Sequence, residues 1–402
     1  MLALEGIRVL DLSNYVPGAL CTMIIADFGA EVIKVEPAKP FPLGEMGYSP
    51  KGEDKRKEAA YFALNRNKKC IGLNLRSEAG QQIFYRMAKE ADVIIEGYRP
   101  GVVNRLGVDY ETIRKINPKI IYCSLSGYGQ DGPYRLLSGH DINYISIAGV
   151  LGLLGTREGP PVIPLNLIAD FAGVSLYGAI GILLAILARN KTGEGQYIDH
   201  TYLEGAVHLM TWFTHRYFMD GTMLKRGESW AHGAYPYYGV YKTKDGGYLS
   251  IGCLEPHFWD NLCDVLGKEE LKAYKWDIEM TYRPPDEKHD EIRTFLEQTF
   301  LTKTRDEWFD ILAGKDIPVG KVYSTDEVFT DPQIVHRKMV IEVEHPTLGS
   351  VRQVGILPKL SETPGRVRSL APMHGEHTDA ILKGLGYSDE EIDTFRREGN
   401  VG

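Results

Sequence analysis

The 402-residue sequence lacks several patterns that would identify a function directly. Its five cysteines are scattered and form no C-x-x-C pair, which argues against a zinc site or a disulfide framework and favours a reducing, cytoplasmic location. There is no G-x-G-x-x-G fingerprint for NAD or FAD, and no G-x-S-x-G nucleophile elbow. The sequence therefore predicts neither a bound metal nor a resident redox cofactor.

Long stretches of positive charge are also absent. The net charge is −8, and no basic run exceeds a few residues, which argues against nucleic acid or an anionic membrane as the main partner. The first residues, M-L-A-L-E-G-I-R-V-L, lack a basic segment before a long apolar one and are typical of a strand rather than a signal peptide. The apolar run at residues 171–188 is slightly shorter than the roughly 20 residues of a spanning helix, so a buried core helix is expected.

What the chain does contain is an alternation of apolar strands and helices, which predicts a doubly wound α/β fold. Strands are expected at Ile7–Leu12, Glu31–Glu36, Cys70–Leu75, Asp92–Glu96, Lys119–Ser126 and Gln196–Asp199. Further on, Trp230–Gly252 is rich in aromatic residues and glycine and predicts antiparallel hairpins of a smaller α+β domain. We expect a large domain over residues 1–199, a linker helix over 200–226, a small domain over 227–330 and a return to the large domain over 331–402. The polar stretch at residues 37–59 is expected to be a long surface loop.

The segment from Ser138 to Arg189 carries the chemistry. His140 precedes Asp141, and Asp170 follows about thirty residues later; each aspartate is expected to cap a helix. Helix N-termini offer unpaired N–H groups, which suit an oxyanion or enolate, and a His–Asp pair beside them could move protons. The alternative is that Asp170 only caps its helix and His140 only closes a turn.

Other candidates are weaker when taken singly. Basic residues flank the expected strands of the first domain and are either solvated surface or a phosphate site; they are Arg66, Lys68, Lys69, Arg76, Arg99 and Arg105. Glu255 precedes Pro256 just after an expected strand, where a turn residue and a functional carboxylate are equally plausible. His208 and His215 share one expected helix without a third ligand and are interpreted as structural.

Several motifs together resemble one family. They include D-F-G-A-E-V-I-K-V-E-P, E-G-Y-R-P-G-V, L-S-G-Y-G-Q-D-G-P-Y, G-H-D-I-N-Y, L-I-A-D-F-A-G and G-E-G-Q-Y-I-D, in that order, with G-E-H-T-D-A-I-L-K-G-L-G-Y near the end. The chain thus resembles the family III CoA-transferase superfamily. G-H-D-I-N-Y together with L-E-P-H-F is similar to its α-methylacyl-CoA racemase branch.

The resemblance implies a Rossmann-like large domain, a small domain, a homodimer of two interlocked chains, and acyl-CoA as the substrate, with no separate cofactor. It assigns catalytic roles to His140 and Asp170, with Glu255 as a supporting carboxylate. It also implies a set of CoA-binding residues, namely Leu73, Asn74, Arg76, Gly97, Tyr98, Arg99, Arg105, Gly139, Asp141, Asn143 and Tyr144.

Three activities remain open at this point. The first is racemisation of 2-methylacyl-CoA through an enolate, with His140 and Asp170 as the two bases. The second is CoA transfer through an acyl anhydride on Asp170, which residues 40–60 and the motif Y-F-A-L-N-R favour, whereas the absence of a glycine run in Trp230–Gly247 favours the racemase. The third is acyl-CoA binding without catalysis.

Overall fold

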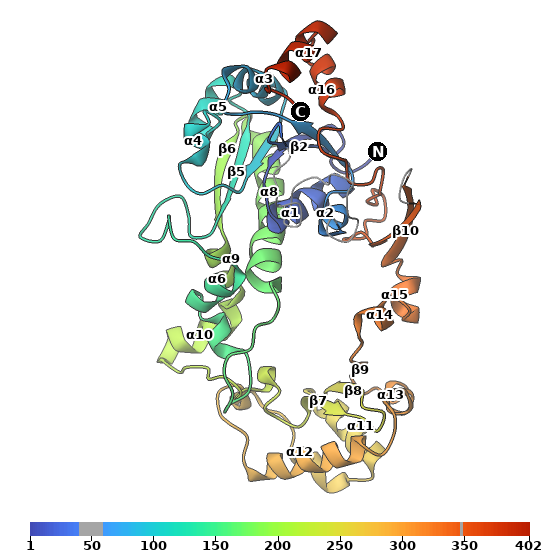
Figure 1. Cartoon of the computed structure of the whole chain (residues 1–402). Coiled ribbons are helices and arrows are strands. Elements are labelled where there is room, and N and C mark those ends of the chain that lie inside the picture. The colour runs from blue at the N-terminus through green and yellow to red at the C-terminus, as the bar shows by residue number, and fades with distance from the viewer. Residues whose placement is uncertain (40–58, 346–348) are drawn as a thin grey trace. The chain divides into compact units, whose positions relative to one another are not determined.

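The computed structural model describes residues 1–39, 59–345 and 349–402 (Figure 1). The chain forms two compact units: residues 1–148, 165–209 and 333–402 make the first, and residues 149–164 and 210–332 make the second. The expected large-domain span therefore includes one segment, residues 149–164, that belongs to the second unit. Arg226 holds it there by donating to the carbonyl oxygens of Thr156 at 3.2 Å and Gly159 at 2.8 Å. The loop expected at residues 37–59 lies almost wholly outside the described residues.

The first unit is built on a six-stranded parallel sheet, which confirms the α/β class. The strands are β1 (Arg8–Leu12), β2 (Glu31–Glu36), β3 (Lys68–Gly72), β4 (Val93–Glu96), β5 (Ile121–Ser126) and β6 (Gln196–Thr201), in the order β3-β2-β1-β4-β5-β6. The third strand ends earlier than the expected Leu75, because Leu73 instead forms a bridge with Val401 near the chain end. The order in which strands are added reverses between β1 and β4: β2 and β3 lie on one side of β1, and β4, β5 and β6 lie on the other. Ligands of open α/β sheets bind at the carboxyl ends of the strands beside such a point.

Helices cover both faces of this sheet. They are α1 (Val16–Asp27), α2 (Ala59–Leu64), α3 (Glu78–Lys89), α4 (Val102–Arg105), α5 (Tyr110–Ile116), α6 (Asp141–Ile147), η2 (Leu167–Leu176), α8 (Tyr177–Thr192), α9 (Tyr202–Leu209), α16 (Thr378–Gly384) and α17 (Asp389–Arg397). A hairpin of β10 (Val340–His345) and β11 (Gly349–Val354) follows the second unit.

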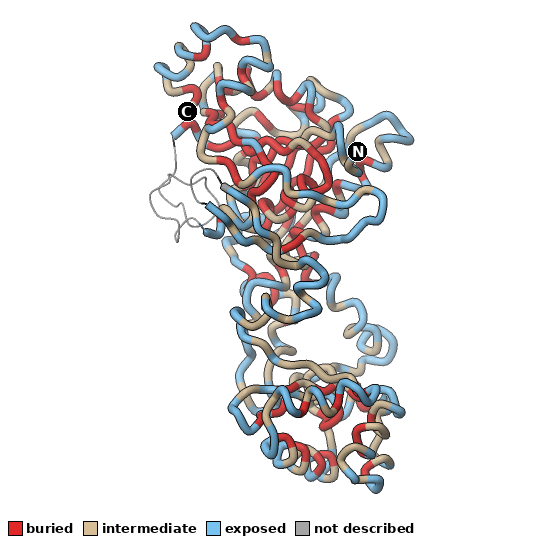
Figure 2. The backbone as a smooth tube through the Cα atoms, turned by 90° about the vertical axis from the view of Figure 1, so that its right-hand side faces the viewer, coloured by how far each residue is buried: buried red, intermediate tan, exposed pale blue. Residues whose placement is uncertain are grey.

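Buried residues gather in the interior of each unit (Figure 2), and alternation along the strands divides the core of the first unit into two layers. Leu10 of β1 lies in one layer with Phe84 of α3, and Val9 lies in the other with Ile25 of α1 and Ile182 of α8. Successive side chains of a strand point to opposite faces, so apolar residues at every position require helices on both sides. The packing thus explains why the inner strands carry apolar residues on both faces, whereas β6, at the edge of the sheet, is polar and largely exposed.

Two of the basic residues considered for phosphate are buried in ion pairs. Lys68 Nζ donates to Asp11 Oδ2 at 3.3 Å and to the Ala19 carbonyl at 3.0 Å, and burial lowers its pKa to about 8. Arg66 binds Asp27 through Nε and Nη2 at 3.0 and 2.7 Å. Both side chains stabilise the packing around α1, so neither is available to an external phosphate. Lys69 Nζ lies 2.6 Å from Glu31, which leaves Arg76, Arg99 and Arg105 as candidates.

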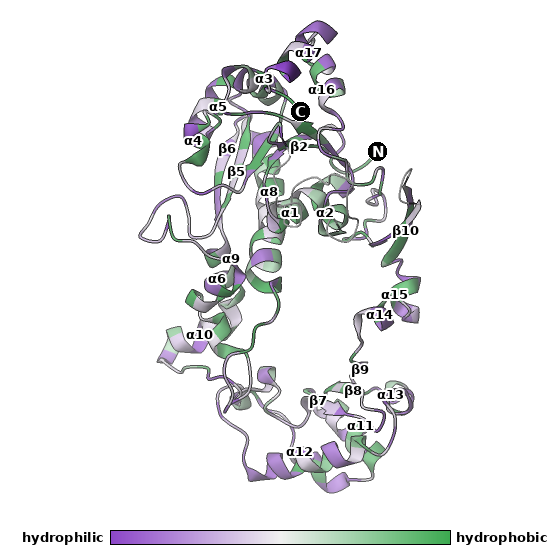
Figure 3. Cartoon of the chain, viewed as in Figure 1, coloured by the Kyte–Doolittle hydropathy of each residue, from purple (hydrophilic) through white to green (hydrophobic). Residues whose placement is uncertain are grey.

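The helices η2 and α8 form one continuous stretch, Leu167–Thr192, which is long and apolar enough to cross a membrane by length and composition (Figure 3). One face packs into the core through Val174, Ile182 and Ile186. The apolar side chains of the opposite face are exposed, and they are Leu176, Ile180, Leu183, Leu184 and Leu187. We refer to these five residues as the α8 stripe.

The second unit holds the predicted hairpin. Strands β7 (Tyr238–Lys242) and β8 (Tyr248–Gly252) are antiparallel, and a third strand that the sequence did not predict, β9 (Val319–Lys321), pairs with β8. The helices are α7 (Val150–Leu153), α10 (Thr211–Asp220), η3 (Trp230–His232), α11 (Pro256–Leu266), η4 (Glu269–Ala273), η5 (Ile278–Thr281), α12 (Glu287–Phe300), α13 (Arg305–Ala313) and α14 (Thr325–Val328), with α15 (Pro332–His336) at the boundary. The linker helix expected over residues 200–226 is two helices, α9 and α10.

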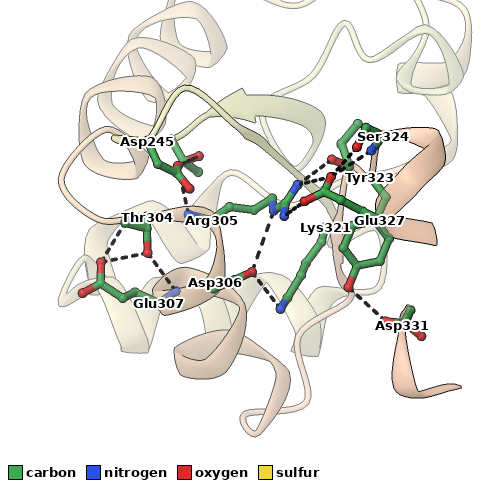
Figure 4. A network of polar contacts seen from close by, with 12 residues as sticks. Asp245, Thr304, Arg305, Asp306, Glu307, Lys321, Tyr323, Ser324, Glu327 and Asp331 are labelled. Atoms are coloured by element: carbon green, nitrogen blue, oxygen red, sulfur yellow. Dashed lines mark hydrogen bonds and ion pairs between the residues drawn. The ribbon is translucent and has the colours of Figure 1, made fainter. Parts of the chain in front are cut away.

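A polar network fixes the chain after β9 (Figure 4). Arg305, at the start of α13, binds both carboxylate oxygens of Glu327 in α14. This bidentate pair lowers the pKa of Glu327 to about 2. Tyr323 donates to Asp331 at 2.9 Å, and Lys321 Nζ lies 2.8 Å from Asp306. The segment that leads back to the first unit is thus anchored to the second by charged side chains rather than by apolar packing.

Candidate active site

His140 is the N-cap of α6, one residue earlier than the sequence predicted. Its backbone N–H donates to Asn143 Oδ1 at 3.0 Å, and its carbonyl accepts from Asn143 N at 2.8 Å. The imidazole is exposed. Asp141, predicted to be the cap, is instead the first helical residue. The cap is therefore supplied by Asn143, which leaves the imidazole at the mouth of the helix.

The Asp141 side chain has a different partner. It is 4% exposed, and Oδ2 accepts from the backbone amides of Ala169 at 2.7 Å and Asp170 at 2.9 Å. A tertiary contact has therefore replaced the local cap that the sequence suggested. The Asp170 amide was expected to be among the donors to an enolate oxygen, but it already donates to Asp141. Any contact between Asp141 and CoA would have to involve its backbone.

Asp170 does not cap a helix either: it is the fourth residue of η2, a π-helix. Wide turns of this kind are rare and occur frequently at functional sites. Gly173 in η2 and Gly205 in α9 allow their backbones to touch, since a Cβ added at Gly205 would lie 2.3 Å from the Gly173 carbonyl oxygen. His200 Nε2 also lies 3.0 Å from that oxygen. The helix that carries Asp170 is therefore held from both ends, by Asp141 and by α9.

The carboxyl of Asp170 is half-buried, and burial is the largest cause of its raised pKa. Asn166 Nδ2 donates to Oδ2 at 3.0 Å, which lowers the pKa, whereas the charge of Asp141 raises it. His140 lies close enough to lower it by electrostatic attraction. The structure thus brings together the two residues that the sequence selected, and it adds Asn166, which the sequence did not reveal.

Arg99 joins the same region. Its Nη2 donates to Ser138 Oγ at 2.6 Å, and its charge lowers the pKa of Tyr144, which burial raises. Tyr144 in turn donates to the Gly139 carbonyl at 2.7 Å. A Cβ at Gly139 would lie 2.8 Å from the Tyr144 ring, so this turn requires glycine. Five of the predicted CoA-binding residues therefore lie around His140: Arg99, Gly139 and Tyr144, together with Asp141 and Asn143 on the first turn of α6.

The other predicted CoA-binding residues follow β3 and β4. Asn74 donates its backbone N–H to the Asn400 carbonyl at 2.8 Å, so the segment from Leu73 to Arg76 is fixed by the chain end. Leu73 is buried, whereas Arg76 and Arg105 are exposed. Gly97 and Tyr98 directly follow β4. All of these residues except Arg105, at the end of α4, come just after the carboxyl end of a parallel strand.

Glu255 belongs to the second unit. It is the exposed N-cap of α11, with Pro256 at the first helical position, and its side chain makes no capping hydrogen bond. His208 and His215, expected on one helix, lie on α9 and α10 and contact Tyr177 and Tyr282 respectively. Within the described ranges, no three or more His, Cys, Asp or Glu side chains are arranged to hold a metal ion.

Glu96, the last residue of β4, was not among the residues that the sequence indicated. It is 1% exposed, and burial raises its pKa to about 7. Its Oε2 accepts from Tyr98 N at 2.7 Å. A glutamate that ends a fully apolar strand, V-I-I-E, at the ligand side of a parallel sheet is a signal that could have revealed it.

Comparison with known proteins defines the class. Residues 4–378 match CoA-transferase family III, and the chain therefore belongs to this family. It is 34% identical to the α-methylacyl-CoA racemase of Homo sapiens over 97% of this chain and 95% of that protein. It is 33% identical to the succinyl-CoA:glutarate CoA-transferase of Homo sapiens over 99% of this chain and 90% of that one. A crystal structure of a CAIB/BAIF family protein from Brucella suis has a TM-score of 0.82 and 29% identity, covering 96% and 99% of the two chains.

Proposed function

We propose that this chain is a racemase of 2-methylacyl-CoA thioesters that acts through two bases and an enolate. The observation that supports this most is the pair formed by His140 and Asp170, a free imidazole beside a half-buried carboxyl whose pKa is raised. The likeness to a racemase over nearly the whole chain, together with the L-E-P-H-F sequence at Glu255, supports the same branch.

The proposed racemisation needs no cofactor, because one base removes a proton and the other base supplies the proton that replaces it. For one enantiomer, neutral His140 removes the α-proton, the thioester becomes an enolate, and protonated Asp170 returns a proton to the opposite face. For the other enantiomer, the carboxylate of Asp170 removes the proton and the imidazolium of His140 returns one. The raised pKa of Asp170 supports this scheme, because a two-base racemase needs one base protonated and the other free. Glu255 is proposed as the supporting carboxylate.

CoA is proposed to bind along the carboxyl ends of β3 and β4, with Arg76, Arg99 and Arg105 on its phosphates. The strand order β3-β2-β1-β4-β5-β6 supports a Rossmann-like large domain in this role. We also propose that the protein is a homodimer, which the exposed α8 stripe supports.

A second candidate is CoA transfer between carboxylic acids. The likeness to a CoA-transferase over 99% of the chain favours it specifically. Here the carboxylate of Asp170 would attack the thioester carbonyl, releasing the CoA thiolate and forming an acyl anhydride. The thiolate would then attack the Asp170 carbonyl of this anhydride, which releases the first acid and leaves Asp170 as a CoA thioester. A second carboxylate would attack that thioester to form a new anhydride, and the thiolate would return to the second acyl carbonyl and free Asp170.

One experiment separates the two. A single enantiomer of a 2-methylacyl-CoA is incubated with the enzyme in D₂O with no second acid present, and NMR follows the α-position. Racemisation with deuterium uptake is the expected result. No α-exchange, together with hydroxylamine trapping of an acyl group on the protein, would replace the racemase with the transferase.

A further inference from the structure

Glu96 is a buried carboxyl that the proposed chemistry does not use. It ends β4 in the middle of the six-stranded sheet, where the register places it between Leu12 of β1 and Ser124 of β5. It is 1% exposed, and its surroundings raise its pKa to about 7. A carboxyl at such a position changes its charge within the physiological pH range.

One side of Glu96 holds the loop that carries Arg99. Oε2 accepts from Tyr98 N at 2.7 Å, directly between the end of β4 and Arg99. The loop ends at Gly101, whose φ of +84° starts α4, the helix that ends at Arg105. A hydrogen bond to a carboxylate is shorter and roughly twice as strong as one to a neutral acceptor. The backbone in front of Arg99 is therefore held most firmly when Glu96 is ionised.

The other side of Glu96 connects to solvent. Ser124 is the cross-strand neighbour of Glu96 and its side chain lowers the pKa of Glu96, and its hydroxyl accepts from the Tyr197 hydroxyl at 2.9 Å. Ser124 and Tyr197 line a cavity of about 220 Å³ together with Tyr110 and Gln130, and Tyr197 is 37% exposed. A proton can thus reach the buried carboxyl along two hydroxyl groups.

No cation is among the groups that shift the pKa of Glu96. Ser124 and the Tyr98 amide lower it, and Asp199 of β6, in the same cross-strand row, raises it. From β1, Asp11 faces the same loop and helps to raise the pKa of Tyr98. Tyr122 and Cys123 of β5, and Tyr197 of β6, also interact with the charge of Glu96.

Whether Arg99 and Arg105 lie close to Glu96 decides whether ionised Glu96 strengthens or weakens the binding of phosphate. If Arg99 or Arg105 lay close to Glu96, each would lower its pKa, and bound phosphate would repel the carboxylate. Neither contributes to the shift. We therefore expect the hold on the loop, rather than direct repulsion between Glu96 and bound phosphate, to dominate the effect of ionising Glu96.

We propose that Glu96 is a positioning residue for acyl-CoA: as a carboxylate it fixes the Gly97–Gly101 loop and so presents Arg99 to the phosphates, and on protonation it releases this hold. The inference rests on the proposed CoA binding. It predicts that affinity for CoA falls as the pH decreases from 8 to 6, while the pH dependence of kcat follows the catalytic carboxyl of Asp170 instead.

The test measures the Kd of CoA by titration calorimetry at several pH values between 6 and 8. Wild-type protein is compared with Glu96→Gln, which keeps the shape of the side chain and removes the charge. The terminal phosphate of CoA itself titrates near pH 6, so the measured quantity is the ratio of the two Kd values, repeated with dephospho-CoA. We expect Glu96→Gln to bind about five-fold more weakly at pH 8 and equally well at pH 6.

Two further variants separate positioning from a general loss of structure. Ser124→Ala removes a hydrogen bond that lowers the pKa of Glu96, so the midpoint of the affinity change should move to higher pH. Tyr110 lines the same cavity, so Tyr110→Phe serves as the control and should leave the midpoint unchanged. A constant Kd ratio across this pH range, or an unmoved midpoint in Ser124→Ala, would overturn the inference. Failure of wild-type protein to bind CoA at any pH would instead refute the proposed function.

Discussion

In the proposed mechanism His140 and Asp170 act on opposite faces of the enolate, so their variants should fail in different ways. Removing either base should stop inversion, because the proton can no longer return from that side. The remaining base can still exchange deuterium into the enantiomer from which it removes the proton. We expect His140→Ala and Asp170→Asn each to lower racemisation by at least about a hundredfold. Any residual exchange should favour opposite enantiomers, as measured by NMR on each pure enantiomer in D₂O. Equal exchange of both enantiomers by one variant would contradict the two-base scheme.

Asn166 offers a finer test of the same carboxyl. Its amide donates to Asp170 and stabilises the carboxylate, so Asn166→Ala should raise the already raised pKa of Asp170 further. Activity that needs the carboxylate is lost as the pH falls through that pKa. For the enantiomer that Asp170 deprotonates, the acid limb of kcat/KM should therefore move to higher pH, with a loss of roughly three- to tenfold on that limb.

For the other enantiomer, Asp170 acts as the acid and must hold its proton, so the same substitution should move the alkaline limb to higher pH instead. Ser146→Ala is a suitable control, since Ser146 donates only to the Ile142 carbonyl within α6. If both limbs stayed in place in Asn166→Ala, the hydrogen bond from Asn166 would have no part in setting the protonation state of Asp170.

At the scale of elements, the contact between η2 and α9 positions Asp170. A methyl group at Gly205 would lie 2.3 Å from the Gly173 carbonyl oxygen, a backbone atom that cannot rotate away. We expect Gly205→Ala to destabilise the fold by about 1–3 kcal/mol or more and to lower kcat more than it raises KM. Gly384→Ala in α16 meets no atom within 4 Å and serves as the control. Thermal unfolding and steady-state kinetics measure both effects, and an unchanged Tm in Gly205→Ala would show that the two helices can separate.

The same elements show what the sequence can and cannot predict. The inner strands of the sheet were predictable because they are rich in apolar residues and turn residues bound them, whereas the edge strand β6 is polar and mostly exposed. His140 and Asp170 were recognisable from the motifs as candidate catalytic residues. Their exact settings were not, because Asp141 reaches twenty-eight residues along the chain to Ala169 rather than capping its own helix. A π-helix, a buried pair such as Lys68 with Asp11, and the role of Glu96 all depend on tertiary contacts that local patterns do not encode.

At the scale of the whole molecule, the α8 stripe needs a partner. Its five residues are spaced at i, i+4, i+7, i+8 and i+11, which places them on one face of the helix, and Leu184 and Leu187 are 61% and 59% exposed. An apolar face of this size on one helix is typical of an interface. We therefore expect the protein to be a dimer at micromolar concentration, as measured by light scattering.

In the proposed interlocked dimer the two chains could not separate without unthreading, so a substitution in the stripe should act during assembly rather than on the finished dimer. We expect Leu184→Glu to lower the yield of dimer after refolding from denaturant by about tenfold, because a buried unpaired carboxylate is costly. Ile278→Glu, an exposed apolar residue of the second unit, should refold as the wild type does. An active monomer of wild-type protein at micromolar concentration would refute the dimer. A normal yield of dimeric Leu184→Glu would move the interface away from the α8 stripe.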